Sequence, residues 1–208
     1  METKLSILIP AYNAEETIEK TLASIPRRND TEIIIYDDGS TDRTVEIVER
    51  VMERIHMPMT LIKGAQNCGV SHAVNMLLGV AMGEWIVLLG SDDWFIPDAF
   101  STAVDALKET LDLVYFNLET NNGTIFRLTN ESKVFYCGST KFMRRAFIGD
   151  TRLNEAKKAG EDYYFFLELL EKKPREAFTN LTVKHYNYPR KGSLSDRRKN
   201  GEFTADEL

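Results

Sequence analysis

The feature of this sequence that most constrains its fold is a regular alternation of short apolar runs with segments of helical periodicity. The apolar runs are KLSILI at 4–9, EIIIY at 32–36, MTLIK at 59–63 and WIVLL at 85–89. Between them, segments 15–25 and 43–55 repeat apolar side chains at helical spacing, and 67–83 is a Gly-punctuated entry into another helix. This alternation predicts βαβ units around a parallel sheet.

Three of the apolar runs end in polar, turn-forming residues. PAYN follows the first run, DDGSTD follows the second and GSDDW follows the fourth. In a parallel α/β sheet the ligand binds beyond the carboxyl ends of the strands. We therefore expect residues 10–13, 37–42 and 90–94 to lie close together and to form one site.

The second half of the sequence is less regular. Helices are expected at 98–108, 140–147 and 162–172, and strands at 113–117 and 183–188, the last as an edge strand. NNG at 121–123 predicts a hairpin turn with antiparallel pairing around it.

Composition limits the classes of function. The chain has 208 residues, which suits one domain, and its net charge of −6 gives no electrostatic reason to bind nucleic acid. Cys68 and Cys137 match no metal-binding spacing and are expected to be free thiols in a reducing compartment. No signal peptide or membrane-spanning run is evident, so we expect a cytoplasmic protein, with peripheral membrane contact left open.

Carboxylates dominate the candidate site, whereas the motifs of other α/β enzymes are missing. The sequence contains no GxGxxG, P-loop, GxSxG or HExxH. Its acidic clusters are Asp37, Asp38 and Asp42, then Asp92 and Asp93, then Glu161 and Asp162. Such oxygen ligands suit Mn²⁺ or Mg²⁺, which would relieve the repulsion between adjacent carboxylates and bind the diphosphate of an anionic substrate.

Each acidic cluster also has a structural interpretation. Asp and Ser favour turns and helix N-caps, which alone would explain residues 37–42. A cap explains one of the aspartates at 92 and 93 but not both, so a metal is the better explanation there. Asp162, at the start of a helix, either interacts with the helix dipole or accepts a proton from an attacking hydroxyl. A base opposite a leaving diphosphate predicts one in-line displacement with inversion.

Four blocks occur in order: SILIPAYNAEETIEKTLASI, EIIIYDDGSTDRT, NCGVSHAVNMLLGVAMGEWIVLLGSDDW and GEDYYFF. Together they strongly resemble the inverting family 2 glycosyltransferases with a GT-A fold, over residues 5–162 and faintly to Ser195. The resemblance implies an α/β fold: a Rossmann-like, mostly parallel sheet flanked by helices, with a smaller mixed acceptor-side region. It implies a nucleotide-sugar-binding half at 1–95 and an acceptor-side and catalytic-base half at 96–195. We expect 196–208 to be a mobile tail.

The resemblance also implies which residues bind the donor nucleotide. Tyr12 would pack near the base, with Pro10 and Asn13 in the same turn. Asp38, followed by Gly39, would accept a hydrogen bond from the base, most often uracil.

The remaining roles concern the phosphates and the reaction. Asp92 and Asp93 would contact the ribose and a diphosphate bound to Mn²⁺ or Mg²⁺. Asp162 would be the catalytic base, with Glu161 orienting the site. Lys191, in the KGSLS segment, would meet the donor phosphates as a point charge.

The activity implied is transfer of a sugar from a nucleotide-sugar, usually a UDP-sugar, to a hydroxyl of a glycan or lipid-linked acceptor. Surface polysaccharide or glycan biosynthesis is the pathway class that follows by analogy. The acceptor half is short for the family, so a partner protein or a membrane surface would complete it. The sequence leaves open whether the protein forms a homo-oligomer.

Three positions depart from the family pattern: Gly90 replaces the first acid of DxDD, Val74 replaces an arginine, and Lys191 replaces a histidine. With the short acceptor half, these departures leave an alternative open: a non-catalytic homologue that binds a nucleotide-sugar or a glycan. A nucleotidyltransferase is a third alternative, but PAYNAEET lacks the Gly-rich and basic loop expected after its first strand.

Overall fold

The structure, a computed structural model, describes residues 2–55, 57–133, 140–157 and 160–190. The elements of its first half are β1 Leu5–Ala11, α1 Ile18–Ala23, β2 Thr31–Asp37, α2 Thr44–Arg54, β3 Met59–Lys63, α3 Val70–Val80 and β4 Trp85–Leu88. Those of its second half are β5 Trp94–Phe95, α4 Pro97–Asp105, β6 Leu113–Thr120, β7 Ile125–Phe126, β8 Lys141–Arg144, α5 Arg145–Ile148, α6 Glu161–Glu171 and β9 Glu176–Tyr186. Lys191 and the expected tail at 196–208 lie outside the described residues.

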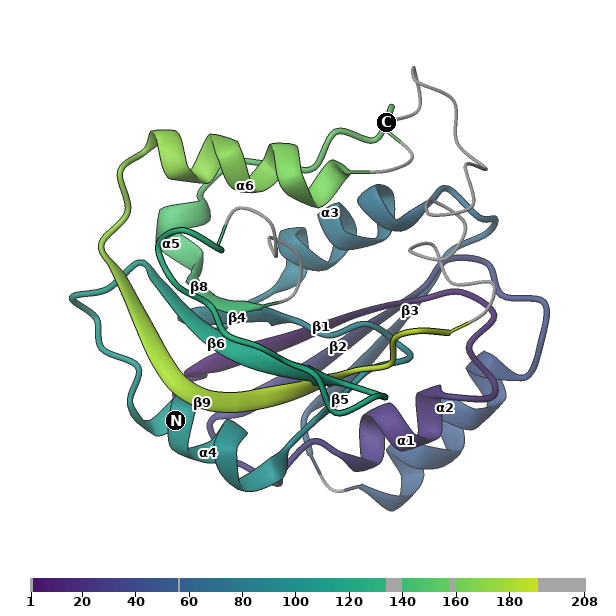
Figure 1. Cartoon of the computed structure of the whole chain (residues 1–208). Helices are drawn as coiled ribbons and strands as arrows, with labels where there is room; N and C mark the ends of the chain where they lie inside the picture. Colours follow the sequence, from purple (N-terminus) through teal and green to yellow (C-terminus); the bar gives the residue numbers. More distant parts are fainter. Residues whose placement is uncertain (1, 56, 134–139, 158–159, 191–208) are drawn as a thin grey trace.

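One mixed sheet runs through these elements in the order β3-β2-β1-β4-β8-β6-β9-β5, with β7 paired to β6 (Figure 1). The predicted parallel arrangement of the first half is confirmed, because β1 pairs in parallel with both β2 and β4, and β2 pairs in parallel with β3. Ile7 lies between Ile33 and Val87 in this register. The carboxyl ends of β1, β2 and β4 therefore meet at one edge of the sheet.

The second half of the sheet contains two differences from the sequence prediction. Residues 140–147 were expected to be helical, but they form β8 and the start of the short α5. Phe142 explains this, because it is fully buried between Val87 of β4 and Val114 of β6, and this central position overrides local propensity. The hairpin expected around 121–123 is present as the β6–β7 pair.

The strand expected at 183–188 is longer than predicted and is not the last strand of the sheet. β9 pairs in parallel with β6 on one side, and Trp94 of the short β5 pairs with His185 on the other. The prediction of an edge strand was therefore wrong for this part of β9.

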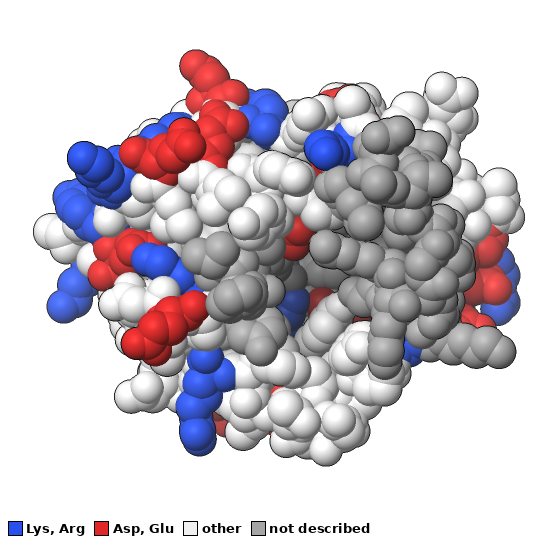
Figure 2. Space-filling view, turned by 45° about the horizontal axis from the view of Figure 1, so that its top comes forward, with Lys and Arg blue, Asp and Glu red and all other residues white. Residues whose placement is uncertain are grey.

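Helices cover both faces of the sheet (Figure 1). α1, α2 and α4 bury Leu22, Val48 and Phe100 in one apolar cluster. α3, α5 and α6 cover the opposite face, where Leu77 and Phe166 belong to a second cluster. Within the described ranges, no helix is both long enough and apolar enough to cross a bilayer. On the face seen in Figure 2, acidic and basic side chains are interspersed around the rim, and a few acidic atoms lie recessed near the centre.

Candidate functional site

The turns after β1 and β2 are joined by side-chain hydrogen bonds. The backbone N–H of Asn13 donates to Oγ of Ser40 (2.9 Å), and the N–H of Thr41 donates to Oδ1 of Asn13 (2.9 Å). Asn13 has a left-handed backbone (φ 46°), which asparagine tolerates better than most residues. The PAYN and DDGST turns therefore lie side by side, as the strand order predicts.

The two acids of the DDGS turn have different surroundings. Asp38 is buried, and its carboxylate oxygens accept the backbone N–H groups of Cys68 (2.9 Å) and Gly69 (2.7 Å) at the entry to α3. Asp37 is also buried, but only its Oδ2 has a partner, the N–H of Ser40 (3.1 Å). Among the described residues, Oδ1 of Asp37 is a buried acceptor without a hydrogen bond.

Gly39 and Asp42 complete this turn. Gly39 has φ +72°, and a Cβ there would lie 2.6 Å from the backbone of Gln66, so only glycine fits. Oδ1 of Asp42 accepts the N–H of Thr44 (2.9 Å), and Oδ2 accepts the N–H of Glu15 (3.1 Å). Asp42 therefore accepts a backbone N–H at the start of α2, as the structural interpretation of this cluster predicts.

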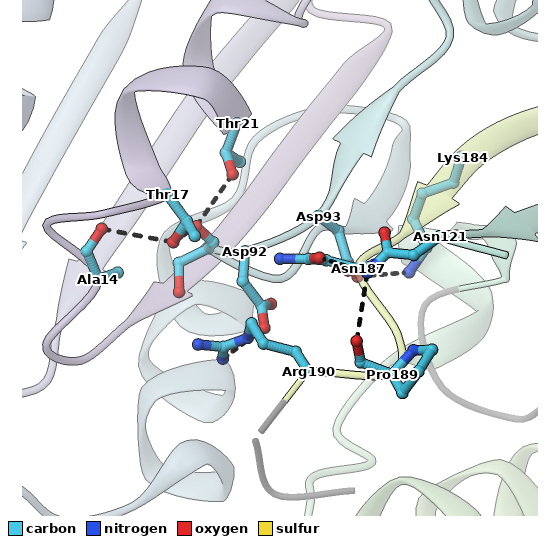
Figure 3. Close-up of polar contacts among 11 residues, drawn as sticks. Ala14, Thr17, Thr21, Asp92, Asp93, Asn121, Lys184, Asn187, Pro189 and Arg190 are labelled. Carbon is cyan, nitrogen blue, oxygen red and sulfur yellow. Dashed lines mark hydrogen bonds and ion pairs between the residues drawn. The ribbon is translucent and has the colours of Figure 1, made fainter. Parts of the chain in front are cut away.

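The loop after β4 is tied to α1 at Ser91. The carbonyl oxygen of Ser91 accepts hydrogen bonds from the hydroxyls of Thr17 (2.9 Å) and Thr21 (2.9 Å) (Figure 3). The third turn of the predicted site is thus held beside the segment that follows the PAYN turn.

Asp93 is committed to an internal ion pair. Its Oδ2 lies 3.0 Å from Nζ of Lys184 in β9, and its Oδ1 accepts the N–H of Asn187 (2.9 Å) (Figure 3). The side chains of Asp93 and Lys184 are only 5% and 3% exposed. Both oxygens of this carboxylate are therefore used in joining the β4 loop to β9.

Asp92 is the more accessible acid of the pair. Its side chain is 25% exposed, and Oδ2 accepts a hydrogen bond from the guanidinium of Arg190 (2.7 Å) (Figure 3). Burial and the charge of Asp93 raise the pKa of the Asp92 carboxyl, and Arg190 opposes this rise. A further cation at Asp92 would likewise favour the ionised form.

The missing first acid at position 90 has a local consequence. A Cβ on Gly90 would lie 2.9 Å from Oδ1 of Asp92 and 3.2 Å from Oδ2 of Asp93. Both carboxylates therefore fold back over the glycine, and a larger residue at this position would displace at least one of them.

The expected base region lies next to the end of β4. Asp162, in the first turn of α6, lines a small cavity together with Leu88 of β4 and Lys141 of β8. Lys141 is buried, and its Nζ lies 4.2 Å from the ring centre of Phe166. Glu161 precedes Asp162 and is half-buried. Tyr163 and Tyr164 follow and are exposed, and Phe165 and Phe166 line the cavity with Asp162.

The remaining predicted donor residues lie at the same edge. Pro10 is the next-to-last residue of β1 and is half-buried, and Tyr12 follows the strand with its side chain 46% exposed. An exposed ring at this edge is available to pack against a ligand.

A divalent metal fits these residues only in part. Among the described residues, no group of three or more His, Cys, Asp or Glu side chains is arranged to hold a metal ion. Asp92 offers one carboxylate, which is compatible with Mn²⁺ or Mg²⁺ when a diphosphate supplies further oxygens. The oxygens of Asp93 are already occupied by Lys184 and Asn187.

Sequence reasoning missed the cations of this site. Lys184 and Arg190 pair with acids that are 91 and 98 residues away in the sequence, so no local motif relates them. For Lys184, one sequence signal was available: the alternating pattern of the strand at 183–188 contains a lysine, and a lysine on the buried face of a strand needs an acidic partner.

The sequence model described as Glycosyl transferase family 2 matches residues 6–167 of this chain. TarS of Staphylococcus aureus, a poly(ribitol-phosphate) beta-N-acetylglucosaminyltransferase, is 25% identical over 184 residues, which cover 79% of this chain and 32% of TarS. WfgD of Escherichia coli, a UDP-Glc:alpha-D-GlcNAc-diphosphoundecaprenol beta-1,3-glucosyltransferase, is 28% identical, with 80% of this chain and 70% of WfgD covered. The chain thus spans about a third of the length of TarS.

Solved structures show the same fold. S. aureus TarS in complex with UDP-GlcNAc gives a TM-score of 0.80 at 24% identity, covering 91% of this chain and 60% of that chain. The mannosyltransferase PcManGT from Pyrobaculum calidifontis, in complex with GDP-Man and Mn²⁺, gives 0.74 at 19% identity, covering 97% and 62%. The sheet and helices described above are therefore those of a GT-A fold.

Proposed function

The chain belongs to glycosyl transferase family 2, and on this premise we propose that it transfers a sugar from a nucleotide-sugar to a hydroxyl acceptor, with inversion. The observation that carries this proposal is the pair formed by Asp92 and Arg190 at the ends of β4 and β9. In this pair, the carboxylate of Asp92 can hold a metal ion that binds the diphosphate, and the guanidinium of Arg190 lies next to it and can contact the same phosphates.

A UDP-sugar is the proposed donor. The TarS structures that resemble this chain are complexes with UDP and with UDP-GlcNAc. An imide N–H of uracil needs an acceptor, and Oδ1 of Asp37 is an acceptor of this turn without a partner among the described residues. Because this oxygen is buried, the turn must shift for the base to reach it. Since both oxygens of Asp38 already bind backbone N–H groups, we assign base recognition to Asp37 and loop anchoring to Asp38.

Asp92 is the proposed metal ligand, with Mn²⁺ or Mg²⁺ as the ion. Mn²⁺ is bound in the PcManGT complex. When present, the ion would stabilise the charge of the departing diphosphate as a Lewis acid. Arg190 would add a second positive charge to that side, because its side chain pairs with Asp92 and is still 41% exposed. We propose that Asp93 holds the loop through Lys184 and does not bind the ion.

Asp162 is the proposed catalytic base. It would accept the proton of the acceptor hydroxyl as that oxygen bonds to the anomeric carbon and the bond from this carbon to the diphosphate oxygen breaks. Attack from the face opposite the leaving group inverts the anomeric configuration. The cavity that Asp162 lines together with Leu88 and Phe166 supports this role, because it places the carboxylate beside the end of β4, where the donor site is proposed.

The acceptor is proposed to be a glycan or a lipid-linked glycan in surface polysaccharide synthesis, in the cytoplasm or at a membrane surface. The relatives TarS, a poly(ribitol-phosphate) glycosyltransferase, and WfgD, which acts on a diphosphoundecaprenol-linked sugar, support this class. A partner protein or a second copy of the chain would complete the acceptor side.

The proposed function is tested by a donor and acceptor screen. The protein is incubated with Mn²⁺, UDP-GlcNAc or UDP-Glc and a panel of glycan acceptors, and the products are analysed by mass spectrometry and by proton NMR of the new anomeric centre. Transfer with a β-linkage from an α-linked donor supports the proposal. Donor binding without turnover would favour the non-catalytic homologue instead.

A further inference from the structure

The β6–β7 turn holds the end of β9 through a single side chain, that of Asn121. Its Nδ2 donates to Oδ1 of Asn187 (2.9 Å) and to the carbonyl oxygen of Pro189 (3.3 Å), and its Oδ1 lies 2.9 Å from Nε2 of His185. Its backbone N–H also donates to the carbonyl oxygen of Tyr188 (3.1 Å). Asn121 thus contacts four of the five residues from 185 to 189.

The orientation of the Asn121 amide follows from these partners. Because Nδ2 lies between two oxygen acceptors, Oδ1 must face His185, and the imidazole donates to it from Nε2. His185 is itself held by stacking on Trp94 at 4.1 Å between ring centres and by Glu119 at Nδ1 (3.1 Å). The amide is therefore fixed at each of its three contacts.

The turn that carries Asn121 has its own internal support. Oδ1 of Asn122 accepts the hydroxyl of Thr120 (2.6 Å) and the N–H of Thr124 (3.2 Å), and Gly123 adopts φ +78°. Among the described residues, Asn122 makes no hydrogen bond to residues 185–190, so the two neighbouring asparagines have different roles. Asn122 shapes the turn, and Asn121 holds the segment opposite.

The segment held by Asn121 carries both contacts to the paired aspartates. The N–H of Asn187 binds Asp93, and the guanidinium of Arg190 binds Asp92 (Figure 3). Figure 3 shows Asn121 on the other side of this segment from the aspartates, with its dashed contacts to Asn187 and Pro189. Asn121 is therefore linked to Asp93 through Asn187, and to Asp92 through Pro189 and the Arg190 that follows it in the chain.

We propose that Asn121 is a positioning residue for donor binding: it fixes residues 187–190 so that Asn187 holds Asp93 and Arg190 faces the diphosphate side of the site. This inference rests on the proposed function for its ligand. Without the Asn121 amide, Asn187 and Pro189 lose their side-chain partner, and the segment that aligns Arg190 with Asp92 becomes free to move. Donor affinity then falls, while the catalytic base is untouched.

The test compares Asn121→Ala, Asn121→Asp and the control Asn122→Ala in the full chain. Hydrogen exchange of the Asn187 amide is measured without ligand, and UDP is titrated calorimetrically in the presence of Mn²⁺. We expect exchange at Asn187 to become roughly tenfold faster and UDP binding roughly tenfold weaker in Asn121→Ala, as the loss of two hydrogen bonds predicts. Asn121→Asp should behave similarly, since it keeps the acceptor for His185 but loses the donor to Asn187 and Pro189. Asn122→Ala should leave both quantities within about twofold of wild type.

The two readouts separate this inference from the proposed function. If wild type binds UDP and Asn121→Ala binds it equally well, Asn121 does not position the donor site. If wild type binds no nucleotide, the proposed function fails, and unchanged exchange at Asn187 in Asn121→Ala would overturn the positioning role independently. An equal loss in Asn122→Ala would assign the effect to the turn as a whole and would also overturn the specific role of Asn121.

Discussion

The ammonium of Lys184 lies 3.0 Å from Oδ2 of Asp93, and both side chains are almost completely buried. This pair joins β9 to the loop after β4 and uses one oxygen of the second aspartate in the GSDDW motif. The N–H of Asn187 uses the other. Two adjacent carboxylates thereby take separate tasks, with Asp93 bound internally and Asp92 left at the surface of the site.

Removing Lys184 should destabilise the protein strongly. In Lys184→Met, Asp93 keeps its charge in a buried position without its cation, which costs about 3–5 kcal/mol of the free energy of unfolding. The control is Lys63→Met, which breaks the exposed pair of Lys63 with Glu49 and should cost less than about 1 kcal/mol. Urea denaturation of the three proteins measures the difference. An equal loss of unfolding free energy in both variants would show that the buried pair contributes no more to stability than the exposed pair.

Replacing Asp162 should abolish transfer but not donor binding. Asp162→Asn keeps the shape of the side chain and cannot accept the proton of the acceptor hydroxyl, so we expect kcat to fall by about 10³-fold. The UDP dissociation constant should stay within about twofold of wild type, because Asp162 has no role in holding the nucleotide. Glu168→Gln, an exposed position on the same helix, is the matched control. Full activity in Asp162→Asn would remove it as the base.

The two acids of the DDGS turn should respond differently to conversion into asparagine. Asp38→Asn turns an NH₂ group toward a backbone N–H of Cys68 or Gly69, which should lower the free energy of unfolding by about 1–3 kcal/mol. Asp37→Asn places an NH₂ group where Oδ1 has no partner, and it should weaken UDP binding by roughly tenfold. Denaturation and calorimetric titration measure these effects. The reverse pattern would return base recognition to Asp38, as sequence resemblance implies.

The ion pair of Asp112 with Arg175 should make the free energy of unfolding fall as the pH becomes acidic. Hydrogen bonds from Arg175, at 2.8 Å and 2.7 Å, hold the pKa of the Asp112 carboxyl below its usual value despite its burial. Because the folded protein binds this proton more weakly than the unfolded chain, the stabilisation is present above the unfolded pKa of about 3.9 and is lost as pH falls through the folded value. The difference in unfolding free energy between wild type and Asp112→Asn should therefore be largest near neutral pH and shrink below about pH 4. A difference that is constant with pH would exclude this linkage.

The sequence determined the parts of the fold that depend on local patterns. β-branched runs and helical periodicity predicted β1 to β4, and the polar residues after them predicted which turns would meet, as the bond between Asn13 and Ser40 confirms. β8 could not be predicted in this way, because Phe142 is in a strand only through its neighbours β4 and β6. The partners of the paired aspartates were equally invisible, since Lys184 and Arg190 reach them from the far end of the chain.

The proposed role of Asp92, to bind a metal-bound diphosphate, is tested most directly by titration of UDP. UDP is titrated calorimetrically into wild type and Asp92→Ala, each in Mn²⁺ and in EDTA, after circular dichroism has shown that both are folded. We predict binding to wild type in Mn²⁺ that weakens at least roughly tenfold in EDTA or in Asp92→Ala, as expected when charge-assisted contacts to phosphate are removed. Equal affinity in all four titrations would contradict the claim and make both aspartates structural.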